Sequence, residues 1–124
     1  MLKLFVMEET LGVARLDVAE KIPEWSQKGA FFSITKTQEE LSIVCEDRFI
    51  PSEMKVERGW RCFKVEGPLD FGLTGILSSL ASPLAAAKVS IFAISTYDTD
   101  YLLVKKENFE KAKEILGTFC KIRS

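Results

Sequence analysis

The sequence predicts an α+β protein that consists of two small units of similar design in tandem. Two observations carry this prediction. Hydrophobic residues alternate in some short segments and recur at helical spacing in others. In addition, one stretch of sequence resembles another that lies 60 residues further along. A chain of 124 residues has room for two units only if each is very small.

The internal similarity pairs Phe31–Phe49 with Ile91–Phe109 without a gap, and the same offset of 60 pairs Gly12 with Gly72. Each copy has the pattern of a strand, a tight polar turn and a second strand, which is typical of an antiparallel hairpin. The alternative is a chance likeness between two amphipathic hairpins. A duplication would place the boundary near Lys55–Trp60, so we expect one unit in residues 1–60 and another in residues 61–124.

The second unit has the more regular pattern. The expected elements are a strand, a helix, two strands and a helix, over residues 61–66, 73–87, 89–95, 101–105 and 109–119. This order is that of a ferredoxin-like βαββαβ unit whose last strand is missing or is supplied by the other copy.

The first unit looks degenerate. Residues 2–7 and 12–19 both favour strands, and Pro23 leaves room for only a short helical turn near Trp25. After the hairpin, residues 50–54 allow a further turn of helix. We therefore expect this unit to act as scaffold and the functional site to lie in the second unit.

Composition excludes several classes of function. The chain carries 17 basic and 18 acidic residues, so no positive excess is available for a phosphate backbone and nucleic acid is not expected as a partner. Histidine is absent, which excludes His-dependent catalysis and His-ligated metals. We expect neither a metal nor a cofactor.

Cysteine usage and hydropathy point to a cytoplasmic protein. The three cysteines have no CxxC spacing, and an odd number without a secretory leader indicates reduced thiols. The N-terminus becomes acidic after seven residues, too early for a signal peptide. The longest apolar stretch, Phe71–Ala87, is interrupted by Gly, Ser, Thr and Pro, so no membrane contact is expected.

Three segments of the second unit could carry chemistry. Gly67–Gly72 joins a strand to a helix, where free amides can bind a carboxylate or phosphate; the alternative is a plain loop with Asp70 as the helix cap. Pro83 removes the intrahelical partner of the Ser79 carbonyl, which either exposes a polar group or only bends the helix. The polar run Ser95–Asp100 is either a solvated turn or a place where Asp100 pairs with a cation.

At these residues the sequence resembles a known family. EGPLDFGLTGILSSLASPLAAAKVSIFAISTYDTDYLLVKKENF resembles the ACT domain, in the branch of small bacterial tandem-ACT proteins and the CASTOR cytosolic arginine sensors, and FFSITKTQEELSIV resembles the matching hairpin. The resemblance covers roughly Leu4 to Phe119. It implies a βαββαβ fold for each unit and a regulatory module that binds an amino acid at an interface between domains or subunits.

By position, the resemblance also implies a ligand-binding site. Ser79 and Leu80 match helix positions that hold the α-amino-acid end of the ligand, and Asp100 matches the acid that meets its cationic group. The βα loop and the hairpin contribute the remaining positions, which are Asp70, Phe71, Thr74, Thr96 and Tyr97. Leu73 stands where the arginine sensors can carry an acid, so arginine is not implied as the ligand.

The leading interpretation is a non-catalytic amino-acid-binding regulatory module. Since only one regular copy exists per chain, a pocket between copies needs two chains, and we expect a homodimer with a regulated enzyme as a further partner. One alternative is a ligand-free dimerisation domain. Another is an enzyme on a ferredoxin-like scaffold that uses Asp70 or Asp100 as a base, although an aspartate of ordinary pKa is a weak base.

Overall fold

The structure is a computed structural model that describes residues 2–67 and 74–124. These residues form two compact units. Residues 9–60 form one, which we call the N-terminal unit, and residues 2–8 pack with the part of the chain after residue 60 to form the C-terminal unit. The sequence also predicts a division after residue 60, but it assigns residues 2–8 to the other unit.

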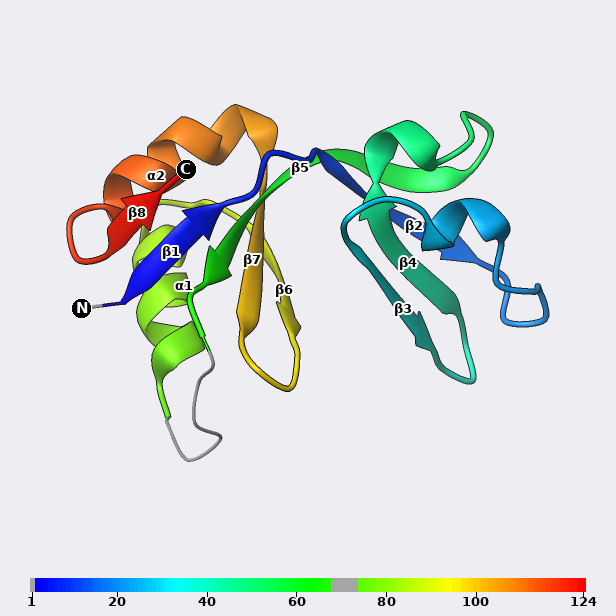
Figure 1. Ribbon diagram of the computed structural model, residues 1–124, viewed down its shortest axis with the longest axis horizontal. Coiled ribbons are helices and arrows are strands. Elements are labelled where there is room, and N and C mark those ends of the chain that lie inside the picture. Colours follow the sequence, from blue (N-terminus) through cyan, green and yellow to red (C-terminus); the bar gives the residue numbers. More distant parts are fainter. Residues whose placement is uncertain (1, 68–73) are drawn as a thin grey trace. The chain divides into compact units, whose positions relative to one another are not determined.

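A sheet of five strands forms one layer of the C-terminal unit (Figure 1). In spatial order the strands are β6 (Ile91–Ser95), β7 (Asp100–Lys105), the second half of β5 (Lys55–Val65), β1 (Lys3–Val6) and β8 (Lys121–Arg123). Helices α1 (Ile76–Ala86) and α2 (Phe109–Leu116) form the second layer, and the 3-10 helix η3 (Lys106–Asn108) leads into α2.

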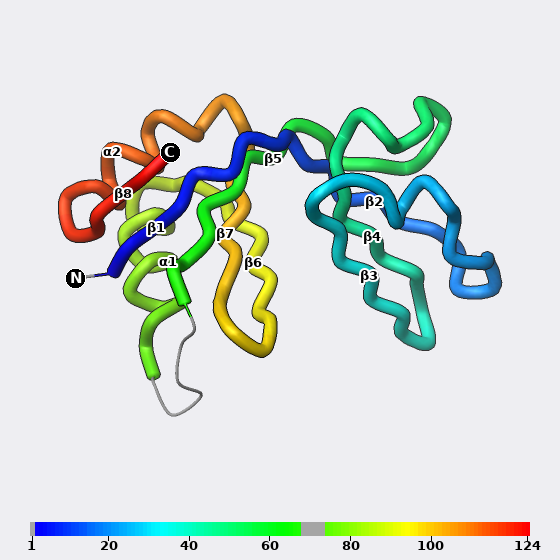
Figure 2. Tube along the Cα trace, viewed as in Figure 1, coloured from blue at the N-terminus to red at the C-terminus, as the bar shows by residue number. Residues whose placement is uncertain are grey.

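Strand β1 occupies the position beside β5 for which the sequence of the second unit offers no strand. It lies antiparallel to β5, and β8 lies parallel to β1 on its outer side. Figure 2 shows these three segments running side by side, although they are far apart in the sequence. The strand next to β5 is therefore supplied by the start of the chain, while β8, which the sequence analysis does not predict, forms the edge.

The hydrophobic core of the C-terminal unit lies between the helices and one face of the sheet. It contains Phe63 and Phe109, whose rings stack with centroids 5.2 Å apart. The other large, fully buried side chains of this core come from both layers and are Leu4, Val65, Leu80, Leu84, Leu102, Val104 and Leu116. Helical spacing of apolar residues therefore identified the buried sides of α1 and α2 correctly.

The N-terminal unit is an antiparallel sheet with the order β3-β4-β2-β5. Its strands are β2 (Leu11–Leu16), β3 (Phe32–Lys36), β4 (Leu41–Glu46) and the first half of β5. Only 3-10 helices, η1 (Glu24–Gln27) and η2 (Asp47–Phe49), occur between these strands. The core of this unit is correspondingly small and is formed by Ala14, Leu16, Leu41, Ile43, Cys45 and Ile50.

The turn of helix expected at residues 50–54 does not form there: the Met54 N–H donates to the Pro51 carbonyl at 3.2 Å, which closes a single turn, and the 3-10 helix η2 lies earlier. The guanidinium of Arg58 donates hydrogen bonds to the main-chain carbonyls of Asp47, Ile50 and Pro51, at 3.0–3.1 Å, and so holds this segment in place. Pro51 has no N–H to donate, so η2 cannot continue through it as a regular helix.

Both hairpins form as expected, but their equivalence is shifted by one residue. In β3–β4 the Thr37 N–H donates to the Glu40 carbonyl, and in β6–β7 the Thr96 N–H donates to the Thr99 carbonyl. The two turns therefore correspond at an offset of 59, not the 60 inferred from identities. A shift of one residue exchanges the two faces of a strand, so Phe32 and Phe92, which the offset of 60 pairs, lie on opposite faces: Phe32 is opposite the core residue Cys45, and Phe92 is opposite Leu103, on the side away from the helices.

The C-terminal end of α1 offers a test of backbone strain. Val89 N–H donates to the Leu84 carbonyl and Lys88 N–H to the Ala85 carbonyl, the two bonds of a Schellman motif, which places Lys88 at φ 63°. A residue with a side chain destabilises the folded state by roughly 1–2 kcal/mol in this left-handed conformation. Glycine avoids that strain, but its greater backbone freedom stabilises the unfolded state and cancels part of the gain. We expect Lys88→Gly to raise the free energy of unfolding by about 0.5–1 kcal/mol.

Urea denaturation measures this change. Lys88→Ala is the matched control, because alanine has the same conformational strain as lysine at this position and should give no gain. Equal stability of the glycine and alanine variants would contradict the strain argument.

Candidate functional site

One end of the C-terminal unit gathers most of the predicted site residues. Figure 1 shows the β6–β7 turn and the start of α1 at the same end of this unit. Topology explains this placement, because a strand, a crossover helix and a second strand bring the ends of both strands to one edge of a sheet. The turn is also tied to β5, since the Thr99 hydroxyl donates a hydrogen bond to the Val65 carbonyl.

An open depression of about 230 Å³ lies between the end of β5 and the β6–β7 turn. Its lining is polar and carries an ammonium, a carboxylate and three hydroxyl groups, from Lys64, Asp98, Thr96, Thr99 and Tyr101, with Gly67 beside them. The Lys64 Nζ atom lies 5.8 Å from the centre of the Tyr101 ring. Of the expected site residues that the structure describes, the depression includes only Thr96.

The β6–β7 turn holds Thr96 in a fixed conformation. The Thr96 hydroxyl accepts from the Thr99 N–H at 3.3 Å and donates to the Thr99 carbonyl at 3.1 Å. Thr99 itself is buried, with 5% of its surface exposed. Tyr97 stands at the tip with 81% of its surface exposed. The sequence analysis missed Thr99, whose only signal was a hydroxyl between two aspartates.

Asp100 lies on the opposite side of the sheet from that depression. It pairs with Ser95 across the first position of the hairpin, and the Ser95 hydroxyl donates a hydrogen bond to its Oδ1 atom. Since strand residues alternate between faces, Asp100 shares the helix side with the core residues Leu102 and Val104. The Ser95 hydroxyl therefore orients the Asp100 carboxylate near the layer that contains α1.

The α1 residues of the predicted site differ in what they can contribute. Thr74 and Ser79 are exposed, and the Ser79 hydroxyl donates to the Ile76 carbonyl at 2.7 Å. Leu80 is fully buried in the core, so its side chain cannot contact a ligand at the surface. Asp70 and Phe71 lie outside the described residues. The N-cap of α1 is Gly75, and the first-turn amides that follow it lack intrahelical partners.

Pro83 lies inside α1 without ending the helix. The helix continues to its C-terminal cap, where the Lys111 ammonium donates to the Ala87 carbonyl at 2.9 Å. The proline therefore leaves α1 continuous from Ile76 to Ala86.

The cysteines give no nucleophile. Cys45, Cys62 and Cys120 are all buried and form no disulfide. Burial raises the pKa of the Cys45 thiol to about 11, with Asp47 and Glu46 adding to the effect, and burial also raises the pKa of Cys120. A thiol reacts as its thiolate, so these two groups are inert near neutral pH.

Within residues 2–67 and 74–124, no group of three or more His, Cys, Asp or Glu side chains could hold a metal ion. In the same ranges no helix is long and apolar enough to cross a membrane.

A comparison with protein families decides what kind of chain this is. A family model described as the ACT domain matches residues 55–118, which is more than half of the sequence. The chain belongs to the ACT domain family. The resemblance inferred from the sequence is thereby confirmed, and a second model, for an N-terminal domain, matches residues 9–53 of this ACT protein.

Solved structures and curated relatives agree with this assignment. The crystal structure of a protein from Agrobacterium tumefaciens is 42% identical with a TM-score of 0.93, and the match covers 98% of this chain and 92% of that one. An aspartate kinase from Clostridium acetobutylicum, described as an allosteric enzyme, has a TM-score of 0.64 and 16% identity over 90% of this chain and 33% of its own, which shows a shared fold only.

The human cytosolic arginine sensor for mTORC1 subunit 1 is 32% identical over 108 residues. The match covers 81% of this chain and 32% of the sensor, so the chain spans about a third of the length of the curated relatives that it matches.

Proposed function

We propose that this protein is a non-catalytic cytoplasmic module that binds an amino acid and regulates an enzyme. The observation that carries the proposal is the ACT domain match over residues 55–118. Two relatives support it: the human protein is named as an arginine sensor, and the Clostridium enzyme is described as allosteric. The absence of histidine and the raised pKa of Cys45 and Cys120 also favour binding over catalysis.

The N-terminal unit is, in this proposal, a reduced ACT-type unit. Its strand order places the first strand, β2, between β4 and the first half of β5, as in a ferredoxin-like sheet. The 3-10 helices η1 and η2 stand where such a unit has its two helices. The C-terminal unit then supplies the binding site, and a second chain completes it in a homodimer.

The ligand site in this proposal lies between α1 and the β6–β7 turn. Amides of the first turn of α1 suit a carboxylate, because they point along the helix axis at the positive end of its dipole. Asp100, oriented by the Ser95 hydroxyl, suits an ammonium or guanidinium group. The loop with Asp70 and Phe71 and the exposed positions Thr74, Ser79, Thr96 and Tyr97 complete the site, to which Leu80 contributes its main chain.

Thermal denaturation in the presence of each of the twenty amino acids tests the function. A ligand that binds only the native state stabilises it by about 2.7 kcal/mol at a hundredfold excess over Kd. Light scattering with and without the stabilising amino acid tests the dimer. A panel without any shift would favour a ligand-free dimerisation domain, and a strict monomer at micromolar concentration would contradict the shared pocket.

Replacing the carboxylate tests the site itself. Asp100→Asn keeps the shape and the Ser95 hydrogen bond but removes the charge, and a charge-assisted hydrogen bond contributes about 1.5–3 kcal/mol. We expect the amino acid with the largest thermal shift to bind roughly tenfold to a hundredfold more weakly, as measured by calorimetry.

Asp98→Asn is the matched control, because this exposed aspartate lies in the same turn but lines the depression on the opposite side of the sheet from Asp100. Equal affinities of the wild-type and Asp100→Asn proteins would remove Asp100 from the site.

A further inference from the structure

The charge of the chain is divided unevenly between the two units. The C-terminal unit carries ten basic and eight acidic residues, a net charge of +2, whereas the N-terminal unit carries seven basic and ten acidic residues, a net charge of −3. These values combine to the −1 of the whole chain. The expectation that nucleic acid is no partner rests on that total, and the total conceals a local excess of positive charge.

Much of this positive charge lies on the face of the sheet that the helices leave uncovered. The strand register pairs Lys3 with Lys121, and Phe5 with both Arg123 and Lys64. The intervening residues Leu4 and Val65 belong to the core, so these side chains point to the opposite face. Tyr101 precedes the core residue Leu102 and shares that face. We call this surface the basic aromatic face, formed by Lys3, Phe5, Lys64, Tyr101, Lys121 and Arg123.

Aromatic rings and cations alternate across this face. Tyr101, Lys64, Phe5 and Arg123 follow one another on β7, β5, β1 and β8. The Arg123 Cζ atom lies 5.9 Å from the centre of the Phe5 ring, and Lys64 Nζ lies 5.8 Å from that of Tyr101. With strands about 4.8 Å apart, the row is roughly 14 Å wide.

The row is accessible to solvent and carries a net positive charge. Phe5 exposes 40% of its surface, unusually much for a phenylalanine, and the Arg123 side chain exposes 44%. Two carboxylates lie at this face: Glu66 is 3.8 Å from Arg123, and Asp98 lines the depression beside Lys64 and Tyr101. Four cations thus stand against two carboxylates, which leaves the face positively charged.

We propose that the basic aromatic face binds single-stranded nucleic acid. An exposed ring on a flat sheet offers a stacking platform for a base, and cations beside each ring can neutralise the phosphates of the same strand. Sheets of βαββαβ topology bind single-stranded RNA in this way, through aromatic side chains on the face opposite the helices. The alternation of rings and cations favours this partner over a lipid surface, for which apolar residues would gather inside a basic rim. This binding would be additional to the proposed amino-acid site.

Fluorescence anisotropy with labelled twelve-nucleotide oligo(U) and oligo(dT) tests the proposal on the whole chain at 50 mM and 200 mM salt. We expect binding that weakens as salt increases. Phe5→Ala should weaken it about 5-fold to 100-fold, the loss expected when one stacked base loses its aromatic partner. Arg123→Gln, which leaves the Phe5 ring in place, should weaken binding and reduce its salt dependence.

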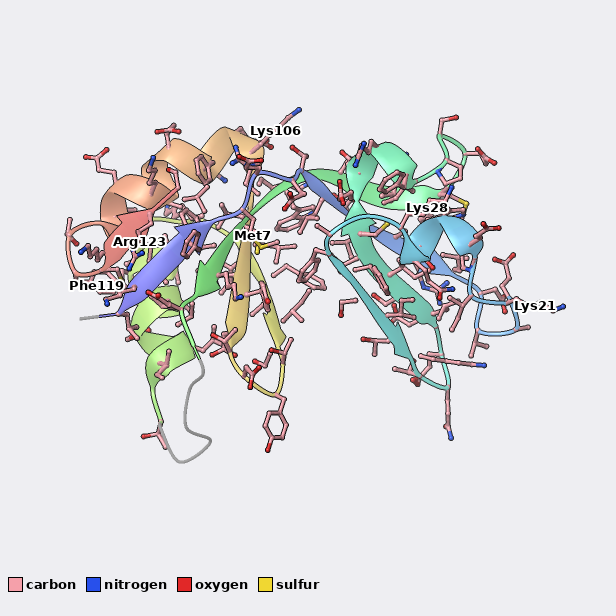
Figure 3. All side chains as sticks on the ribbon, viewed as in Figure 1. Met7, Lys21, Lys28, Lys106, Phe119 and Arg123 are labelled. Carbon is pink, nitrogen blue, oxygen red and sulfur yellow. The ribbon has the colours of Figure 1, made fainter. Side chains whose placement is uncertain are left out.

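Matched controls separate a specific face from general attraction. Lys121→Gln removes a cation of the face, whereas Lys28→Gln removes an exposed cation of the N-terminal unit (Figure 3) and should leave binding unchanged. Circular dichroism melting verifies that each variant is folded.

Three results would overturn the proposal. The first is no binding of either oligonucleotide at 50 mM salt. The second is binding that Phe5→Ala leaves unchanged or that a twelve-base-pair duplex matches, since both indicate charge attraction without stacking. The third is retention by vesicles of anionic lipid without oligonucleotide binding, which would assign the face to a membrane surface.

Discussion

Leu80→Ala is expected to lower the free energy of unfolding by about 2–5 kcal/mol, because it removes a large side chain from a closely packed core. Leu80 is fully buried, and it contacts a cluster that draws on both helices and the sheet. The loss combines the transfer free energy of the deleted methyl groups with the cavity that remains. Urea denaturation at neutral pH measures the change through the transition midpoint.

Ser78→Ala is the control for this prediction. Ser78 is exposed on the same helix, so its replacement should change stability by no more than about 0.5 kcal/mol. In the proposed ligand site Leu80 contributes its main chain, which Leu80→Ala retains, so the replacement should lower stability and leave the affinity of the folded protein unchanged. A Leu80→Ala protein of unchanged stability that binds its amino acid more weakly would show that the side chain acts in the site and not in the core.

Local patterns predicted the elements of the C-terminal unit well, because each pattern depends on neighbours within a few residues. Helical spacing located α1 and α2, and alternation located β6, β7 and the second half of β5. The expected boundary segment, Lys55–Trp60, is instead the first half of β5. Strand β1 was predicted as a strand but assigned to the wrong unit, since its partners β5 and β8 are distant in the sequence. Strand β8 has three residues, two of them charged, and carries no periodic signal of its own.

The one-residue error in the hairpin alignment has a physical cause. An alignment by identity takes no account of which face a side chain occupies, and the strands carry runs of consecutive buried residues, four in β4 and three in β7. Such a run fits two registers equally well by hydrophobicity. The hydrogen bonds that close the two turns, from the N–H groups of Thr37 and Thr96, decide between the registers. In the sequence, the only sign of this register is that the two threonines are 59 residues apart.

The candidate site was less predictable, because its geometry depends on contacts between distant segments. Lys64 and Thr99 come together only when β5 lies beside β7, and no local sequence pattern predicts that strand pairing. The basic aromatic face has the same origin, since its cations come from three strands, β1, β5 and β8, and its tyrosine from a fourth, β7. Whole-chain charge therefore gave no indication of it.

Gly29→Ala is the second large effect that we expect, a loss of about 2–5 kcal/mol in the free energy of unfolding. Gly29 has φ +84°, a conformation that costs an alanine roughly 1–2 kcal/mol. A Cβ atom here would also overlap the Glu46 carboxylate and lie 2.9 Å from the Phe49 ring. Glu46 cannot move freely, because it is buried and accepts hydrogen bonds from Ala30 N–H at 2.8 Å and Arg48 Nε at 3.1 Å.

Gly75→Ala separates the two contributions. Gly75 has nearly the same conformation, φ +77°, but a Cβ atom there meets no atom of residues 2–67 and 74–124 within 4 Å, so its replacement should cost only the conformational 1–2 kcal/mol or so. Combining Gly29→Ala with Glu46→Ala removes the overlap and should cost less than the sum of the two single losses, because the variants then share one defect. Equal losses for Gly29→Ala and Gly75→Ala in urea denaturation would show that the close contact with Glu46 contributes nothing to stability.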